Sequence, residues 1–126
     1  MPSRVVVLML AATSAMVASC DAAGDLLEGC GNEVVRSAVS PSGSKTAIAF
    51  IRDCGATTGY STQVSVVRGR RSEVTGSGNT FIVEGRPEGL ELRWTSDSEV
   101  LVSRPGSGRI FRQEEQVGGT VIKYVY

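Results

Sequence analysis

Residues 46–51 read Thr-Ala-Ile-Ala-Phe-Ile, and this run decides the fold class. It is a continuous apolar segment of strand length, and turn residues precede it at 40–43 (Ser-Pro-Ser-Gly). Pro presets φ at such a point and Gly accepts a positive φ, so the chain reverses there. An apolar run bounded in this way is typical of a strand buried on both faces. We therefore expect a central strand here, preceded by another at 33–39.

The chain on the far side of this run repeats the alternation of strand and turn. Residues 90–94 (Leu-Glu-Leu-Arg-Trp) form the clearest amphipathic strand, and no segment beyond residue 32 has helical apolar spacing over three turns. Further strands are expected at 61–67, 80–84, 99–103, 109–113 and 120–126. The prediction is an all-β domain of about eight short strands, either a small antiparallel β-sandwich or a partly open barrel.

Composition limits the function classes. The 126 residues hold 13 Lys plus Arg, 13 Asp plus Glu and no His, with 41% hydrophobic residues. This length corresponds to one domain. Zero formal charge provides no field to bind a phosphate backbone, and without His the commonest general base and zinc ligand are missing. We therefore predict a protein that is not an enzyme, with no cofactor, no metal and no nucleic-acid partner.

The N-terminal residues predict an export signal. Residues 5–18 contain no charge and follow Arg4. Their length suits the apolar core of a secretory signal and is below the roughly 18–20 residues that span a bilayer. Residues 17–20, Val-Ala-Ser-Cys, end this run with small side chains, which signal peptidases require.

Residues 17–20 resemble the lipobox of bacterial lipoproteins. In that family the Cys thiol receives a diacylglycerol, and the leader is cut just before the Cys. The resemblance implies a signal peptide at 1–19, acylated Cys20 as a membrane anchor, and a place in the bacterial cell envelope. By resemblance to enterobacterial sorting, Asp21 implies retention at the inner membrane. The alternative is an ordinary cleaved signal with Cys20 in a disulfide.

If Cys20 carries lipid, Cys30 and Cys54 remain, and an even remainder in an exported chain predicts one disulfide. The alternative is that Cys20 forms the disulfide with one of these two cysteines, which leaves the other thiol free. Removal of residues 1–19, which contain only Arg4 as a charge, leaves 107 residues with 12 basic and 13 acidic side chains. We divide these residues into a tether at 20–32 and a β-domain at 33–126.

Residues 30–34 (Cys-Gly-Asn-Glu-Val) and 52–65 (Arg-Asp-Cys-Gly-Ala-Thr-Thr-Gly-Tyr-Ser-Thr-Gln-Val-Ser) are the most distinctive stretches. They resemble a family of small bacterial exported proteins that share these segments. In that family a Gly-Asn-(Val/Thr)-Phe segment and a terminal Val-Gly-Gly strand follow, which match residues 78–81 and 117–119 here. The resemblance covers most of residues 30–126. The family has no assigned function, so the resemblance groups this chain with related sequences but implies no biochemical mechanism.

Residues 52–62 form a polar loop rich in hydroxyls and glycines. One interpretation is a small-ligand site in which amides around Gly55 and Gly59 form an anion-binding nest. Its candidate side chains are Arg52, Thr57, Thr58 and Ser61. The other interpretation is a loop pinned by the disulfide, whose hydroxyls bond to their own backbone.

A basic cluster at 68–71 (Arg-Gly-Arg-Arg) is either a contact for anionic lipid headgroups or a solvated turn. Together these features predict a membrane-anchored envelope lipoprotein that binds or scaffolds an unknown envelope protein or small ligand. The alternative is a soluble periplasmic or secreted domain with a small-ligand, anion-type site at 52–62.

Overall fold

The computed structural model describes residues 29–55, 59–104 and 108–126. Its secondary structure in these residues consists of nine β-strands without a helix. The strands are β1 (Gly31–Val39), β2 (Lys45–Asp53), β3 (Ser61–Arg68), β4 (Phe81–Glu84), β5 (Glu91–Ser96), β6 (Glu99–Ser103), β7 (Ile110–Gln113), β8 (Gln116–Val117) and β9 (Thr120–Val125). The predicted signal peptide, Cys20, Asp21, Thr57 and Thr58 lie outside the described residues.

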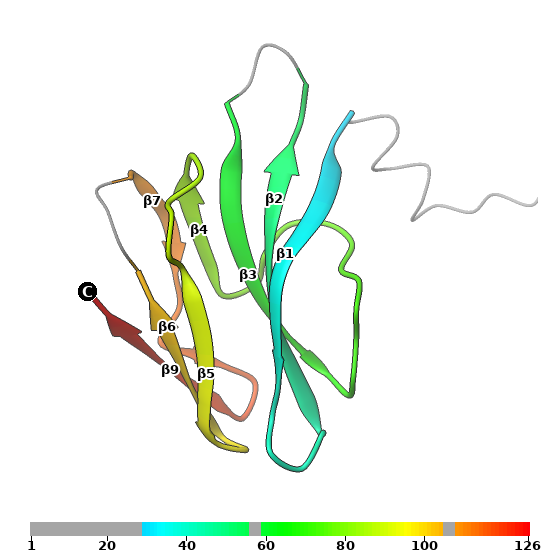
Figure 1. The fold of residues 1–126 in the computed structure, drawn as a ribbon, viewed down its shortest axis with the longest axis vertical. Helices are drawn as coiled ribbons and strands as arrows, with labels where there is room; N and C mark the ends of the chain where they lie inside the picture. The colour runs from blue at the N-terminus through cyan, green and yellow to red at the C-terminus, as the bar shows by residue number, and fades with distance from the viewer. Residues whose placement is uncertain (1–28, 56–58, 105–107) are drawn as a thin grey trace, which may run out of the picture.

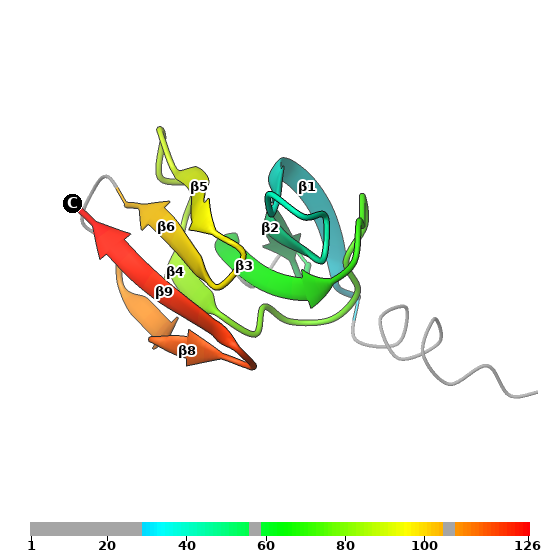
Figure 2. The ribbon, with the colours of Figure 1, turned by 90° about the horizontal axis from the view of Figure 1, so that it is seen from below.

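The strands form two sheets that share one core (Figures 1 and 2). The larger sheet has the order β1-β2-β3-β4-β7, and the smaller has the order β5-β6-β9-β8. The all-β prediction is confirmed, and the structure has two mostly antiparallel sheets that do not close into a barrel. Expected and observed strands agree to within two residues, apart from β8, a two-residue strand that was not expected.

One strand pair departs from the antiparallel expectation. β6 and β9 run parallel, with Glu99 opposite Val121. Between these two strands the chain leaves the smaller sheet, pairs with β4 as β7, and returns through the β8–β9 hairpin. Parallel neighbours need such a crossover, because a tight hairpin joins only antiparallel strands.

β2 is buried on both faces, as residues 46–51 predicted. Ala47 and Ala49 point between the sheets, and Ile48 and Phe50, which alternate with them, point to the outer face. All four side chains have 0% exposure. The second sheet does not pack on this outer face. The loop between β3 and β4 covers it instead.

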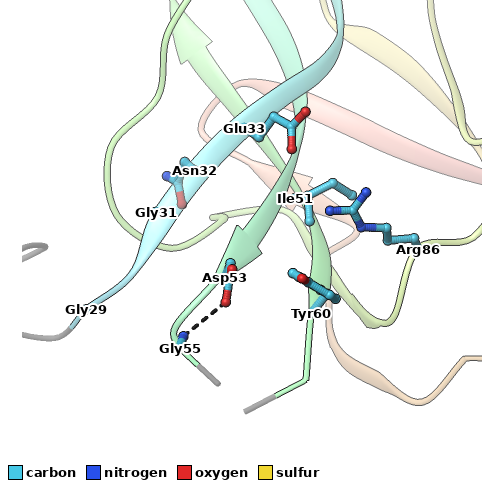
Figure 3. A pocket seen from close by; sticks show the side chains of 9 residues that line it. All are labelled: Gly29, Gly31, Asn32, Glu33, Ile51, Asp53, Gly55, Tyr60 and Arg86. Atoms are coloured by element: carbon cyan, nitrogen blue, oxygen red, sulfur yellow. Dashed lines mark hydrogen bonds between the residues drawn. The ribbon is translucent and has the colours of Figure 1, made fainter. Parts of the chain in front are cut away.

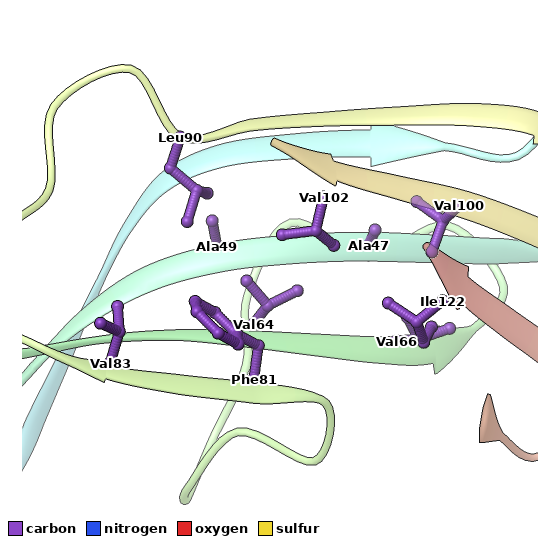
Figure 4. Close-up of a cluster of buried hydrophobic side chains, with 10 residues drawn as sticks. All are labelled: Ala47, Ala49, Val64, Val66, Phe81, Val83, Leu90, Val100, Val102 and Ile122. Carbon is purple, nitrogen blue, oxygen red and sulfur yellow. The ribbon is translucent and has the colours of Figure 1, made fainter. Parts of the chain in front are cut away.

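The core between the sheets joins residues from both layers (Figure 4). The larger sheet contributes small and medium side chains around Phe81, and the smaller sheet contributes Val100, Val102 and Ile122. Trp94 of the predicted amphipathic strand packs against this core, and its indole Nε1 donates to the Ala38 carbonyl at 2.8 Å. Full burial of each such side chain contributes about 1.5–3 kcal/mol, so this core holds the two sheets together.

Residues 69–80 connect β3 to β4 and cover the outer face of β2 (Figure 1). The Asn79 side chain takes the place of a strand partner, because its Oδ1 accepts from the Val66 N–H and its Nδ2 donates to the Val66 carbonyl. Gln63 Oε1 accepts from the Gly78 N–H at 2.6 Å. A Cβ at Gly78 would lie 2.9 Å from the Val64 carbonyl oxygen, so this close approach requires glycine.

The β1–β2 and β5–β6 turns meet at the end of the domain opposite the disulfide. The Ser42 N–H donates to Asp97 Oδ1 at 2.8 Å, and this bond lowers the pKa of Asp97 from its ordinary value. The contact ties the two sheets together at their turns.

Candidate functional site

The disulfide between Cys30 and Cys54 extends the β1–β2 ladder by one pair. Gly31 is opposite Asp53 in this ladder, so the two cysteines occupy the next pair of positions beyond the strand ends. The predicted pairing of Cys30 with Cys54 is therefore present. The bond fixes the separation of β1 and β2 where the neighbouring residues line a cavity.

That cavity has a volume of about 410 Å³, and its lining includes the sequence neighbours of both bonded cysteines, Gly29, Gly31, Asp53 and Gly55 (Figure 3). Alternation along paired strands puts Gly31 and Glu33 of β1 on the same face as Ile51 and Asp53 of β2. Ile51 is 7% exposed and forms an apolar floor, while the charged side chains lie around it and are exposed. The remaining principal lining comes from other segments, namely Tyr60 and Arg86.

Tyr60 and Arg86 lie next to each other although 26 positions separate them. The Arg86 guanidinium lies over the Tyr60 ring, 4.6 Å from its centroid. Two hydrogen bonds hold the preceding residue in place: the Gly85 N–H donates to the Tyr60 carbonyl at 2.8 Å, and Thr62 Oγ1 donates to the Gly85 carbonyl at 2.7 Å. The backbone thus fixes where Arg86 enters the cavity.

A second cavity of about 330 Å³ adjoins the first and shares Ile51 and Arg86 with it. Its other principal lining residues are Val35, Arg36, Pro87, Glu88 and Leu90. We call the two cavities together the groove. Their volumes fall in the range of small-molecule sites, about 300–1,000 Å³, and an apolar floor with a few charged groups is typical of such sites.

Arg52 faces away from the groove. It is 8% exposed, and its Nη1 donates to Asn32 Oδ1 at 2.8 Å and to the Gly76 carbonyl at 2.9 Å. Asn32 Nδ2 in turn donates to the Val74 and Gly76 carbonyls. This predicted ligand residue therefore ties β1 and β2 to the covering loop.

Ser61 is opposite Arg52 in the β2–β3 ladder, and its Oγ accepts from Gln63 Nε2 at 2.8 Å. The structure thus brings Arg52 and Ser61 together on the outer face, whereas Thr57 and Thr58 lie outside the described residues. The Gly55 N–H, a donor of the expected anion nest, donates to Asp53 Oδ1 at 3.0 Å. A carboxylate therefore takes that donor and gives this end of the groove a negative charge.

The sequence interpretation did not find Glu33, Tyr60 and Arg86 as site residues. Glu33 could have been placed beside Ile51 from the disulfide and the strand register, because both are fixed once Cys30 pairs with Cys54. Arg86 carries no local signal, since it reaches the groove only through the β3–β4 pairing.

The basic cluster at 68–71 lies at the opposite end of β2 and β3, where Arg68 pairs with Lys45. Arg68, Arg70 and Arg71 are exposed, and the Arg70 guanidinium lies against Gly43 of the β1–β2 turn. Arg71 Nε donates to the Arg68 carbonyl at 3.4 Å. Arg70 and Arg71 therefore contact neighbouring segments of the protein itself.

No group of three or more His, Cys, Asp or Glu residues in 29–55, 59–104 and 108–126 could hold a metal ion. The described part of the chain also holds no helix that is long and apolar enough to cross a membrane. No protein-family model, curated protein or solved structure matches the chain.

Proposed function

We propose that this protein is a bacterial cell-envelope lipoprotein, anchored to a bilayer through acylated Cys20, whose β-domain is a non-enzymatic binding module. The observation that carries the proposal is the Val-Ala-Ser-Cys sequence at 17–20, at the end of the uncharged run 5–18. Two or three acyl chains at about 0.8 kcal/mol per buried methylene hold a protein stably on a membrane.

The position of the groove supports a binding role near that membrane. Gly29 lies nine positions after Cys20, and an extended chain spans at most about 30 Å over that distance. Gly29 itself lines the groove. With Cys20 in the bilayer, the groove would therefore open within reach of the membrane surface, where it meets either a small ligand or an envelope protein.

A binding role also agrees with the residue types of the chain and of the groove. The sequence contains no His, and the groove combines exposed charges with the apolar floor of Ile51 and Leu90. Such a lining fixes the orientation of a ligand without a nucleophile paired to a base.

Globomycin, which blocks the lipoprotein signal peptidase, tests the anchor in cells that express the full chain. We expect the uncut precursor to accumulate, and the Cys20→Ala variant to remain unprocessed by this route with or without the compound. Normal processing in globomycin, with the product in the soluble fraction, would contradict the proposal and leave the soluble exported domain as the function class.

We further propose that Asp21 retains the protein at the inner membrane. Density-gradient separation of the membranes tests this, with Asp21→Ser as the matched variant. Inner-membrane recovery of the parent and outer-membrane recovery of Asp21→Ser are expected, and the same distribution for both proteins would refute a sorting role.

A further inference from the structure

The groove places charges of opposite sign around one apolar floor. Glu33 and Asp53 lie on the strand ends beside the disulfide, and Arg86 lies across the floor from them (Figure 3). Within the part of the chain that the structure describes, Glu33 and Arg86 form no ion pair. Both charges therefore remain exposed at the cavity, where a ligand can neutralise them.

Arg86 is oriented to receive a carboxylate. Its guanidinium carbon lies over the Tyr60 ring, 4.6 Å from the centroid, and this contact with the ring face does not use the N–H groups as hydrogen-bond donors. The bonds at Gly85 hold its backbone. A guanidinium that is restrained in this way loses less conformational freedom when it binds a carboxylate through two hydrogen bonds.

The acidic end has the complementary chemistry. Asp53 Oδ1 is bonded to the Gly55 N–H, which restrains that carboxylate and leaves further acceptor capacity on both oxygens. Glu33 lies on the same face of the neighbouring strand. Two carboxylates on adjacent strands are suited to an ammonium group, which has three donors and no acceptor.

We propose that the groove binds a zwitterionic amino compound, an amino acid or short peptide with a free ammonium and a free carboxylate. The ammonium binds at Glu33 and Asp53, the carboxylate binds at Arg86, and an apolar side chain covers Ile51 toward Leu90. The second cavity adds one charge of each sign to its lining, Arg36 and Glu88. The inference rests on the proposed binding role and names its ligand class, but it does not depend on the lipid anchor.

Trialanine and two blocked forms of it test the proposal. Amide chemical shifts are followed by ¹⁵N–¹H NMR in the processed chain as purified, whether or not it carries acyl chains. With trialanine at millimolar concentrations we expect shifts at Glu33, Ile51, Asp53 and Tyr60. N-acetyl-trialanine lacks the ammonium and trialanine amide lacks the carboxylate, and each should bind about tenfold more weakly, the effect of losing one charged hydrogen-bonded pair.

Three variants assign the charges to residues. Arg86→Gln should weaken trialanine about tenfold and leave the binding of trialanine amide unchanged, because the amide has no carboxylate to lose. Glu33→Gln should weaken trialanine and leave N-acetyl-trialanine unchanged. Arg93→Gln on β5 is the matched control, an exposed arginine outside the groove, and should have no effect.

The proposal would be overturned if trialanine shifted no amide of the groove or if the three peptides bound equally well. It would also be overturned if Arg93→Gln weakened trialanine binding as much as Arg86→Gln or Glu33→Gln does. An unchanged NMR spectrum of each unliganded variant outside its own site establishes that the fold is intact. The readout is the same with a bare or an acylated Cys20, so its failure is distinguishable from failure of the anchor.

Discussion

The disulfide beside the groove provides the sharpest test of how the domain is stabilised. Cys30 and Cys54 are 24 positions apart, so the loop they close holds 25 residues, counted with both cysteines. In the chain-entropy treatment, closing a loop of this length removes about 12 cal/mol/K from the unfolded chain, or about 3.5 kcal/mol at 25 °C. Small domains have a total stability of about 5–15 kcal/mol, so this bond contributes a large share.

The perturbation is the double variant Cys30→Ser/Cys54→Ser, compared with the parent in urea unfolding followed by Trp94 fluorescence. For a urea slope of about 1–3 kcal/mol/M, the midpoint should fall by about 1.2–3.5 M. The pairing of β1 with β2 should remain in the variant, because backbone pairs join the two strands from Gly31–Asp53 to Val39–Thr46 without the disulfide.

Chemical reduction of the parent is the matched control and should reproduce the loss in the double variant. A loss below about 1 kcal/mol in both proteins would refute the reasoning, since the bond would then constrain little of the unfolded chain. A loss in the variant that reduction does not reproduce would assign the effect to the serines instead.

Three further perturbations test the packing. Arg52→Met keeps the apolar stem but removes the bonds to Asn32 and Gly76, so urea unfolding should show a loss of about 2–3 kcal/mol; unchanged stability would contradict its structural role. Phe50→Ala empties a site with 0% exposure beneath residues 69–80, so a loss of about 3–5 kcal/mol is expected in the same assay; a loss below about 1 kcal/mol would show that the loop does not bury this face. Burial, followed by the charges of Glu114 and Glu115, raises the pKa of Tyr124 above its ordinary value of 10.0. The unfolded chain therefore releases this proton first, and stability should fall as the pH rises above about 10; Tyr124→Phe should make that fall shallower, and an identical pH dependence for both proteins would count against the assignment.

Sequence patterns predicted the strands because local chemistry determines them here. The run 46–51 is apolar throughout and becomes the doubly buried centre of β2, and the alternation at 90–94 places Leu90, Leu92 and Trp94 on the core side. The parallel pair β6–β9 could not be read in the same way. The pairing of these strands depends on the crossover connection through β7 and β8, which no local sequence pattern predicts.

The candidate site was harder to predict because its residues come together only through pairing in three dimensions. Arg52 belongs to the polar stretch that the sequence singles out as a loop, but it lies in β2, where strand alternation turns it to the outer face and it donates to Asn32 and Gly76. Asp53, one position later, faces the groove. A one-residue difference in a strand thus separates a structural residue from a candidate ligand residue.

The distinctive segments are explained in part by the covering loop. Asn32 and Arg52 fix the loop to β1 and β2, and Gly78 and Asn79 fix it to β3. These four residues therefore stabilise the outer face of the larger sheet. Two of the distinctive segments also contribute side chains to the groove, namely Glu33 from 30–34 and Asp53 and Tyr60 from 52–65.

Mass spectrometry of the N-terminal peptide tests the central claim most directly. The peptide released from the processed chain should begin at Cys20 and carry the added mass of a diacylglycerol on its sulfur, with or without a further acyl group on the amine. A peptide with an unmodified Cys20, or with Cys20 oxidised onto another thiol, would contradict the account of a lipid-anchored binding module.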